Sequence, residues 1–398
     1  MPLDLTGRKW PKINKKRSKK SWANWDSGPW RRYTQGIFVH EGQMYAKELS
    51  FYGMTRPIPP EECAITSLFN GGEHGIYGAT SGKKAHVFRY NPKGQDGAVL
   101  DIGTIGKEEA IRNSLVVTND GVVIGGTSAG SGKKKYDGGK IFQYKSWAAP
   151  GEFIQEWEIG DKTIDIVGIP IKGEGIGGMV LDKARGIAYG ISDKTGILFS
   201  YDTKTKKIRK IGPISAGNPG FSLVLTIDSK GKVFGAAGGG RIFCFDPETK
   251  KIARLEAFVP TFAGRNLYDQ LTAITLDGRS GLLYGGTREG NLFAFDPQTC
   301  VVRSLGRPTN LGRIRCLAIT NDGRVFGASG EDEDMNHMFC YNPKGPELKD
   351  LGIPIATMEK RWYGYRFDCM TTGSDGEIYL GESDRISHLF IYHPRIMG

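Results

Sequence analysis

Short stretches of alternating apolar and polar residues, separated by glycine-rich turns, run along most of this 398-residue chain. Alternation with a period of two is typical of β-strands that bury one face. Seven of these stretches carry the same aromatic-hydrophobic signature, hereafter the stamp, as in HVFRYNP at 86–92 and NLFAFDP at 291–297. The central phenylalanines of the stamps recur every 44 to 57 residues, at Phe88, Phe142, Phe199, Phe243, Phe293, Phe339 and Phe390.

A second recurring strand precedes each stamp and ends in glycine and small residues, as in IYGAT at 76–80 and LYGGT at 283–287. A period near fifty residues, with several short strands and glycine turns per unit, is typical of a β-propeller. We therefore predict an all-β fold, a seven-bladed β-propeller built of four-stranded blades.

The ends of the chain predict how the ring closes. Units one to six supply a fourth strand after the stamp, which in unit two is FIQEWEI at 153–159, whereas unit seven has none before residue 398. The segment 36–49 alternates like a strand, so we expect it to pair with the last blade and cover its open edge. The predicted organisation is a basic, tryptophan-rich arm at 1–35 followed by a single propeller at 36–398.

The net charge of +11 is concentrated in residues 1–32, which hold +8 and four of the seven tryptophans. Basic residues interleaved with aromatic ones could bind nucleic acid or an acidic polymer. We favour an arm that packs on a blade, so a nucleic-acid partner is not expected. No apolar run reaches eighteen residues and no signal peptide is visible, so a membrane partner is not expected either. The compartment stays open: cytoplasmic as written, or secreted or periplasmic if the chain is a processed form. We expect a monomer.

One position in each blade, two residues before the stamp phenylalanine, begins the third strand and carries mostly polar side chains. The seven residues are His86, Lys140, Ile197, Arg241, Asn291, His337 and His388. Loops between strands two and three open on the same face as loops entering strand one, and such loops commonly carry function. This set predicts a ligand site at that end of the ring. The alternative, that these histidines only tie neighbouring segments together, stays open.

Loops that enter the first strands, or join strands two and three, add further candidates to this face. The predicted substrate-binding residues are Arg112, Asn113, Arg241, Gln270, Asn291, Arg315, Tyr363, Tyr365 and Arg366, and Tyr136 joins the catalytic candidates. Cationic and phenolic side chains suit an anionic ligand that bears carboxylates or sulfates. The acidic run 331–334 could take a structural calcium ion, but it lacks the spacing of a calcium loop, so a solvated loop is favoured. No catalytic metal and no cofactor are predicted.

The segments YGATSGKKAHVFRYNP at 77–92 and GESDRISHLFIYHP at 381–394 give the chain a family resemblance. It resembles the seven-bladed polysaccharide lyases, the ulvan and rhamnosyl-glucuronate lyases, together with the related rhamnosidase-like propellers. The resemblance implies β-elimination across C4–C5 of a uronate: a cation neutralises the carboxylate, and histidine or tyrosine side chains move the two protons.

Carried onto this chain, the resemblance assigns the catalytic histidine to His86, the blade-two cation to Lys140, where the family uses arginine, and the associated tyrosine to Tyr136. The chain has Thr66 and Ser67 where the family has a second histidine. The chemistry could therefore be carried by other blades, through residues such as His337, His388 and Arg366.

These patterns predict a carbohydrate-active propeller, a lyase that cleaves a uronic-acid-containing glycan by β-elimination. Few carboxylates fall on the predicted face, which argues against a conventional hydrolase with two paired carboxylates. Two alternatives stay open: a non-catalytic propeller that binds an anionic glycan or partner, and a glycoside-cleaving or dehydratase enzyme acting on a smaller sugar.

Overall fold

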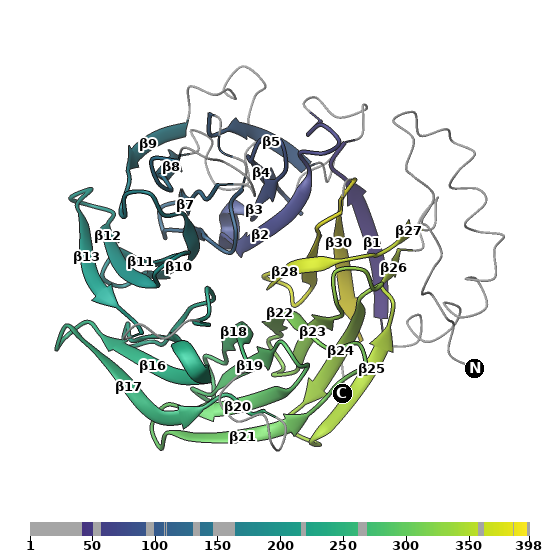
Figure 1. Cartoon of the computed structure of the whole chain (residues 1–398). Coiled ribbons are helices and arrows are strands. Elements are labelled where there is room, and N and C mark those ends of the chain that lie inside the picture. The colour runs from purple at the N-terminus through teal and green to yellow at the C-terminus, as the bar shows by residue number, and fades with distance from the viewer. Residues whose placement is uncertain are drawn as a thin grey trace.

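The computed structural model describes residues 42–50, 57–92, 99–106, 108, 110–129, 136–145, 164–215, 220–261, 269–356, 362–384 and 386–395. In these residues, seven four-stranded antiparallel sheets form a ring of blades, as predicted (Figure 1). The predicted arm at 1–35 lies outside the described residues. No helix of the described residues is long and apolar enough to cross a membrane.

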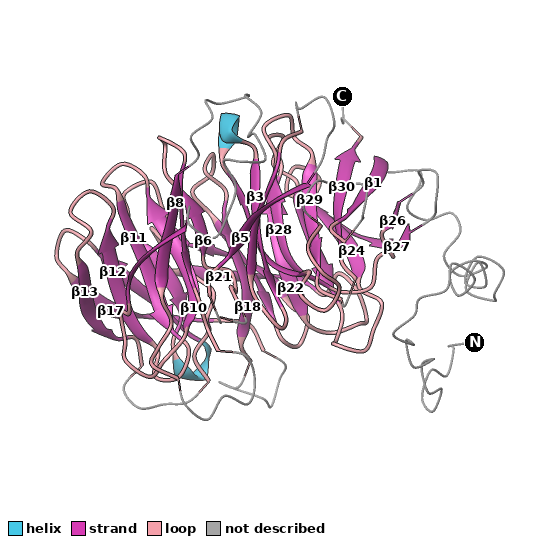
Figure 2. Cartoon of the chain, turned by 90° about the horizontal axis from the view of Figure 1, so that it is seen from above, coloured by secondary structure: helices cyan, strands magenta, loops and turns pink. Residues whose placement is uncertain are grey.

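Each blade is a meander whose first strand is innermost and whose fourth strand is outermost (Figures 1 and 2). Blade one comprises β2 (Ala64–Asn70), β3 (Ile76–Ser81), β4 (His86–Tyr90) and β5 (Val99–Thr104). Blade two comprises β6 (Leu115–Val117), β7 (Val122–Gly126), β8 (Ile141–Lys145) and β9 (Ile164–Gly168). Blade three comprises β10 (Ile176–Asp182), β11 (Ile187–Ser192), β12 (Ile197–Asp202) and β13 (Ile208–Pro213). Blade four comprises β14 (Thr226–Ile227), β15 (Val233–Ala236), β16 (Arg241–Asp246) and β17 (Lys251–Phe258).

Blade five comprises β18 (Leu271–Leu276), β19 (Leu283–Thr287), β20 (Leu292–Asp296) and β21 (Val301–Gly306). Blade six comprises β22 (Ile314–Ile319), β23 (Val325–Ser329), β24 (His337–Asn342) and β25 (Glu347–Gly352). Blade seven comprises β28 (Phe367–Thr372), β29 (Ile378–Glu382), β30 (His388–Pro394) and β1 (Gly42–Glu48). A small hairpin of β26 (Ile355–Ala356) and β27 (Trp362–Tyr363) precedes β28, and the sequence patterns did not predict it.

The ring closes through β1, as the alternation at 36–49 predicted. Strand β1 runs antiparallel to β30, with Met44 opposite Tyr392 and Ala46 opposite Phe390. Met44 is 2% exposed and packs in the core between blades six and seven. The pairing satisfies the outer edge of blade seven, which would otherwise present unpaired backbone groups.

The stamp phenylalanines form the core of the blades because a glycine on the neighbouring strand makes room for each ring. Phe88 lies opposite Gly78, and a Cβ on that glycine would fall 2.0 Å from the Phe88 Cζ atom. Gly285 stands in the same relation to Phe293, at 2.2 Å. Both phenylalanines are at most 1% exposed. The recurrence of glycine and phenylalanine along the sequence is therefore a packing requirement.

The fourth strand of blade two differs from the prediction. It is β9, with Ile166 opposite Phe142 and Gly168 opposite Ile141, whereas the expected segment 153–159 lies outside the described residues. Several other fourth strands, though not β17, carry a glycine at this register shift, and Gly103 and Gly352 adopt positive φ angles of 142° and 80° there. Glycine adopts such angles at little cost.

Candidate functional site

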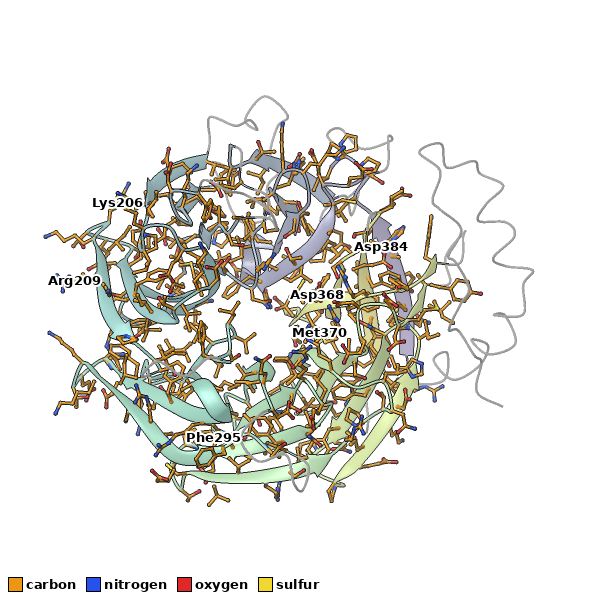
Figure 3. All side chains as sticks on the ribbon, viewed as in Figure 1. Lys206, Arg209, Phe295, Asp368, Met370 and Asp384 are labelled. Atoms are coloured by element: carbon orange, nitrogen blue, oxygen red, sulfur yellow. The ribbon has the colours of Figure 1, made fainter. Side chains whose placement is uncertain are left out.

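The innermost strands share a β-bulge near their first residues, at the end of the ring where the loops that enter them lie. The register shifts place one extra residue at this point in five blades: Thr66, Gly177, Thr272, Arg315 and Asp368. A bulge re-aims the side chain that it carries, and bulges are frequent beside functional sites. Asp368 lies beside the centre of the ring (Figure 3). Two charged residues, Arg315 and Asp368, therefore occupy equivalent positions in neighbouring blades.

Arg315 is the buried centre of a charged cluster between blades six and seven. Its Nε and Nη2 atoms donate to Asp368 Oδ1 at 2.8 and 2.5 Å, and Nη1 donates to Asp332 Oδ1 at 2.9 Å. The Arg315 side chain is only 4% exposed. Burial disfavours its charge, but the two carboxylates outweigh burial and raise its pKa. The Arg315–Asp368 pair connects blade six to blade seven at the inner rim.

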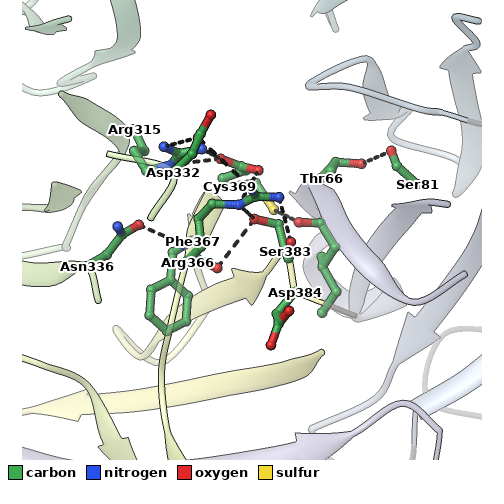
Figure 4. Close-up of polar contacts among 12 residues, drawn as sticks. Thr66, Ser81, Arg315, Asp332, Asn336, Arg366, Phe367, Cys369, Ser383 and Asp384 are labelled. Carbon is green, nitrogen blue, oxygen red and sulfur yellow. Dashed lines mark hydrogen bonds and ion pairs between the residues drawn. The ribbon is translucent and has the colours of Figure 1, made fainter. Parts of the chain in front are cut away.

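Arg366 extends this cluster toward blade one (Figure 4). Its Nε donates to Ser383 Oγ at 2.8 Å and its Nη2 to the Ser383 carbonyl at 2.7 Å, while Asp332 and Asp368 lie 3.9 and 3.6 Å away. Burial and the charge of Arg315 lower the pKa of Arg313, a third guanidinium here. Three guanidiniums therefore face two carboxylates, so these five side chains carry a surplus of positive charge.

A cavity of about 500 Å³, hereafter the blade-seven cavity, opens beside Arg366. It is lined by Glu61, Ala64, Ser81, Gly82, Lys83, Tyr365, Arg366, Ser383 and Asp384. Its volume is in the range of small-ligand pockets. Burial and the negative charge of Asp384 raise the pKa of Tyr365, so its phenol is protonated at neutral pH. Two predicted substrate-binding residues, Tyr365 and Arg366, thus line this cavity together with the Lys83–Glu61 ion pair at 2.5 Å.

His86 occupies the start of β4, as predicted, and is buried between two carboxylates. Its Nδ1 atom lies 3.0 Å from Asp101 Oδ2 and its Nε2 atom 3.0 Å from Glu62 Oε2. The residue is 5% exposed. Burial disfavours the imidazolium, but the hydrogen bonds and charges of Asp101 and Glu62 outweigh it and raise the pKa of His86. These contacts are those of a tie between strands, and the catalytic role of His86 stays a prediction.

The other two histidines at this position also face carboxylates. His337 Nδ1 lies 3.0 Å from Asp350, which occupies the same register in blade six as Asp101 in blade one. His388 Nδ1 lies 2.7 Å from Glu382 Oε2, and the ring stacks on Trp362 with centroids 4.3 Å apart. The buried Nε2 atom of His388 has no hydrogen-bond partner among the described residues. Each histidine lies within its own blade, so the three do not meet.

Tyr136 and Lys140, the blade-two candidates, meet at Glu108. Lys140 Nζ lies 3.0 Å from Glu108 Oε1, and the backbone amide of Lys140 donates to Thr127 Oγ1 at 2.8 Å. Burial and the charge of Glu108 raise the pKa of Tyr136, whose hydroxyl is buried. The carbonyl of Glu108 also accepts from the amide of Ala85, beside His86. The three residues that the family resemblance assigned therefore lie along one seam between blades one and two.

The remaining predicted substrate-binding residues lie elsewhere on this end of the ring. Arg112 and Asn113 are exposed, and Tyr363 is half-buried in β27. The Arg241 guanidinium donates to the Leu255 carbonyl and pairs with Glu256. Gln270 and Asn291 both lie beside Asp269, which accepts from the Gln270 amide at 2.8 Å and from the Asn291 side chain at 3.5 Å. None of these residues lines the blade-seven cavity among its described walls.

Sequence reasoning placed Asp269, Asp368 and Glu61 or Glu62 on this face but did not single out Asp101 and Asp350, which partner His86 and His337. Asp101 and Asp350 occur in the repeated motifs DIG and DLG of the fourth strands, and each accepts a bond from the glycine amide two residues on. The motif recurs in two blades whose third strands begin with histidine. It could therefore have predicted that a fourth-strand aspartate faces each of these histidines. Asp332 and Asp368 occur in no such repeated motif: Arg315 of β22 reaches Asp332 in the loop between β23 and β24, and Asp368 on β28 of the next blade.

The acidic run at 331–334 does not converge on one point. Asp332 faces Arg315, whereas the Asp334 carboxylate accepts from the Glu331 amide at 3.3 Å. No group of three or more metal-ligating side chains is arranged to hold a metal ion in the described part of the chain.

Comparison with known proteins supports the fold of the chain but assigns it to no family. No protein-family model matches the chain, and no curated protein matches it. Among solved structures, a catalytically inactive histidine-to-alanine variant of virginiamycin B lyase from Staphylococcus aureus with quinupristin superposes with a TM-score of 0.61 at 11% identity, covering 89% of this chain and 100% of that one. The chain has a seven-bladed β-propeller fold.

Two further propellers are similar. The extracellular domain of BT4673 from B. thetaiotaomicron gives a TM-score of 0.57 at 15% identity over 87% of this chain, which spans only 39% of that chain. The WD40 propeller of Doa1 gives 0.54 at 13% identity, over 88% of this chain and 97% of that one. At these identities the likeness concerns architecture, and propellers with one architecture perform unrelated functions.

Proposed function

We propose that this propeller is a carbohydrate-active lyase that binds a uronic-acid-containing glycan in the blade-seven cavity and cleaves it by β-elimination. The observation that carries the proposal is the position of Tyr365 and Arg366, consecutive residues that line this cavity. A cation beside a protonated phenol is the pair that elimination from a uronate needs, because one neutralises the carboxylate and the other protonates the leaving oxygen.

Arg366 supplies the cation. Its guanidinium is oriented by two bonds to Ser383, and 30% of its side chain is exposed. The guanidiniums of Arg315 and Arg313 together offset the charges of Asp332 and Asp368. A uronate carboxylate whose charge is neutralised by Arg366 can accept the negative charge that develops when the C5 proton leaves, so that proton becomes more acidic. Arginine also offers a planar fork that matches a carboxylate.

Asp384 and Tyr365 move the protons. The Asp384 carboxylate takes the C5 proton, the electron pair of that C–H bond forms the C4–C5 double bond, and the C4–oxygen bond breaks. Tyr365 donates its phenolic proton to the leaving oxygen, and its raised pKa keeps the phenol protonated until that step. The proton held by Asp384 then returns to the Tyr365 phenolate, since the charge of Asp384 acts on that group. Atoms and protons balance, and no cofactor enters the reaction.

A non-catalytic binding propeller is the second candidate. It is favoured by the three histidines His86, His337 and His388, each of which is bonded to a carboxylate within its own blade. On this alternative the blade-seven cavity holds an acidic sugar without turning it over. Since the fold is shared by both, only turnover distinguishes them.

The deciding experiment follows ultraviolet absorbance of the unsaturated uronate while the full chain is incubated with a panel of uronate-bearing glycans. The lyase proposal expects rising absorbance that Arg366→Ala and Tyr365→Phe abolish. The matched controls are Arg209→Ala and Tyr45→Phe, on outer strands β13 and β1. A flat trace on every glycan, with glycan binding that Arg366→Ala removes, would leave the binding propeller. A flat trace without binding would overturn both.

A further inference from the structure

A second cavity lies on the opposite end of the ring, between blades two and three, and the proposed reaction does not use it. Its volume is about 500 Å³, and it lies among the turns that join strands one to two and three to four. We call it the lysine groove, after the four lysines that line it: Lys145, Lys183, Lys204 and Lys206. Lys206 is seen at the outer edge of the ring in Figure 3.

The groove carries a surplus of positive charge. Its lining has four lysines and one carboxylate, Asp120, whose Oδ1 atom accepts from Thr118 at 2.6 Å. That hydrogen bond, with the charge of Lys145, lowers the pKa of Asp120. Among the described residues, none of the four lysines forms an ion pair. Four other lysines of the described residues are paired, as Lys140 is with Glu108.

Unpaired like charges around one cavity repel each other, and the repulsion is relieved when an anion enters. Lys183 is an exposed residue, but its ammonium lies 5.5 Å from the centroid of the Phe69 ring, and partial desolvation lowers its pKa. A desolvated ammonium gains more from an incoming anion than a fully hydrated one does. The groove is therefore built to favour a negatively charged ligand.

The rest of the lining indicates what carries that charge. Asn119, Gln143 and Thr203 supply amide and hydroxyl groups, and Val122 and Leu181 supply apolar surface. Amides and hydroxyls match the hydroxyls of a sugar, and apolar side chains pack on its C–H face. The charged residues are lysines, compact point charges that do not impose the planar fork with which arginine selects carboxylates. Tetrahedral sulfate esters fit this set.

We propose that the lysine groove is a binding site for a sulfated oligosaccharide, separate from the blade-seven cavity. It would hold a charged chain on the face of the ring opposite the proposed cleavage site. The inference does not depend on the elimination chemistry, because no residue of the lysine groove lines the blade-seven cavity.

The test uses the full chain and maps lysine acetylation by mass spectrometry with and without a heparin-derived hexasaccharide. This readout is resolved by residue, so binding to the basic segment 1–32 does not confuse it. Protection of Lys183 and Lys204 is expected, with Lys207 and Lys210 unprotected, since these two are exposed lysines of the same blade outside the groove. Tripolyphosphate and an unsulfated oligogalacturonate serve as comparison probes.

Affinity gives the second readout. Lys183→Gln with Lys204→Gln should weaken hexasaccharide binding by roughly fivefold to tenfold and reduce its salt dependence, whereas Lys207→Gln with Lys210→Gln should not change the protection of the groove. Thermal unfolding verifies that both double variants are folded. Equal protection of the control lysines, no protection of Lys183, or protection by tripolyphosphate alone would each overturn the proposal. Arg366→Ala should leave the protection intact even if it abolishes elimination.

Discussion

Arg315 of blade six and Asp368 of blade seven occupy the same bulge position on neighbouring inner strands and are joined by two hydrogen bonds of 2.8 and 2.5 Å. Neighbouring blades otherwise meet mainly through apolar clusters. The pair adds a directional contact at the inner rim, next to Arg366 and the blade-seven cavity. Its integrity therefore affects both the ring and the site.

Asp368→Ala should destabilise the protein by about 3 kcal/mol, because removing one partner leaves the other charge buried. The Arg315 side chain is only 4% exposed, and Asp332 alone would then compensate it. Urea unfolding, with the midpoint and slope fitted together, measures the loss. Asp165→Ala, an exposed aspartate on β9, is the control and should change stability by less than about 0.5 kcal/mol. Equal losses in both variants would show that the buried pair contributes nothing.

His86 should make stability depend on pH in a defined direction. Its pKa in the folded state is raised above the ordinary value of 6.5, so the folded protein binds the proton more tightly than the unfolded chain does. The resulting stability is fully present below the unfolded pKa and is lost as pH rises through the folded one. The difference in free energy of unfolding between wild type and His86→Gln should thus be largest below pH 6.5 and shrink as the pH rises above it.

The same measurement in an Asp101→Asn background is the control. Asp101 supplies a hydrogen bond and a charge that raise the pKa of His86, so its removal should flatten the pH dependence. A difference that grows with pH would contradict the assignment of His86 as a protonated tie.

Gly285→Ala should destabilise blade five by about 2 to 3 kcal/mol through overpacking. The added Cβ would lie 2.2 Å from Cζ of the buried Phe293 ring, which has no free space to move into. Gly278→Ala is the matched control, because a Cβ there meets no atom within 4 Å. Urea unfolding of both variants gives the comparison, and a Gly285→Ala protein as stable as Gly278→Ala would refute the packing role of the stamp glycine.

Ring closure can be tested at Met44, the β1 side chain that is 2% exposed in the core between blades six and seven. Met44→Ala should cost about 2 to 4 kcal/mol, since the cavity lies in a packed core. Gln43→Ala, on the exposed face of the same strand, should change little. If both substitutions have the same small effect in urea unfolding, β1 does not contribute to the stability of the ring.

The architecture could be predicted from the sequence because each propeller blade is formed by one continuous segment of the chain. The stamp phenylalanines and their glycines recur within each unit. A single sequence was therefore enough to predict the number of blades, the strand order and the pairing of β1 with β30. The fourth strand of blade two was misplaced because apolar alternation alone does not specify which of two successive segments, 153–159 or 164–168, pairs with β8. Hairpin β26–β27 is too short for any period to be counted.

The site was readable only in part. Arg366 and Tyr365 were found because they cluster with aromatic residues just before a first strand, and they do share a cavity. Their neighbours Asp384 and Ser383 come from another loop of blade seven, and Asp332 comes from blade six. Contacts between loops of different blades depend on side-chain direction at bulges, which spacing along the sequence does not report.

Substitutions at Arg366 and Tyr365 should separate binding from chemistry if the proposed elimination occurs. Arg366→Lys keeps the charge but loses the two bonds to Ser383 and the planar fork, so KM for the glycan should rise several-fold with a smaller change in kcat. Tyr365→Phe removes only the phenolic proton, so kcat should fall by about 10²-fold or more while KM changes little. Steady-state absorbance kinetics on the best glycan measures both. The reverse split, with kcat lost in Arg366→Lys and kept in Tyr365→Phe, would mean that Tyr365 is not the acid.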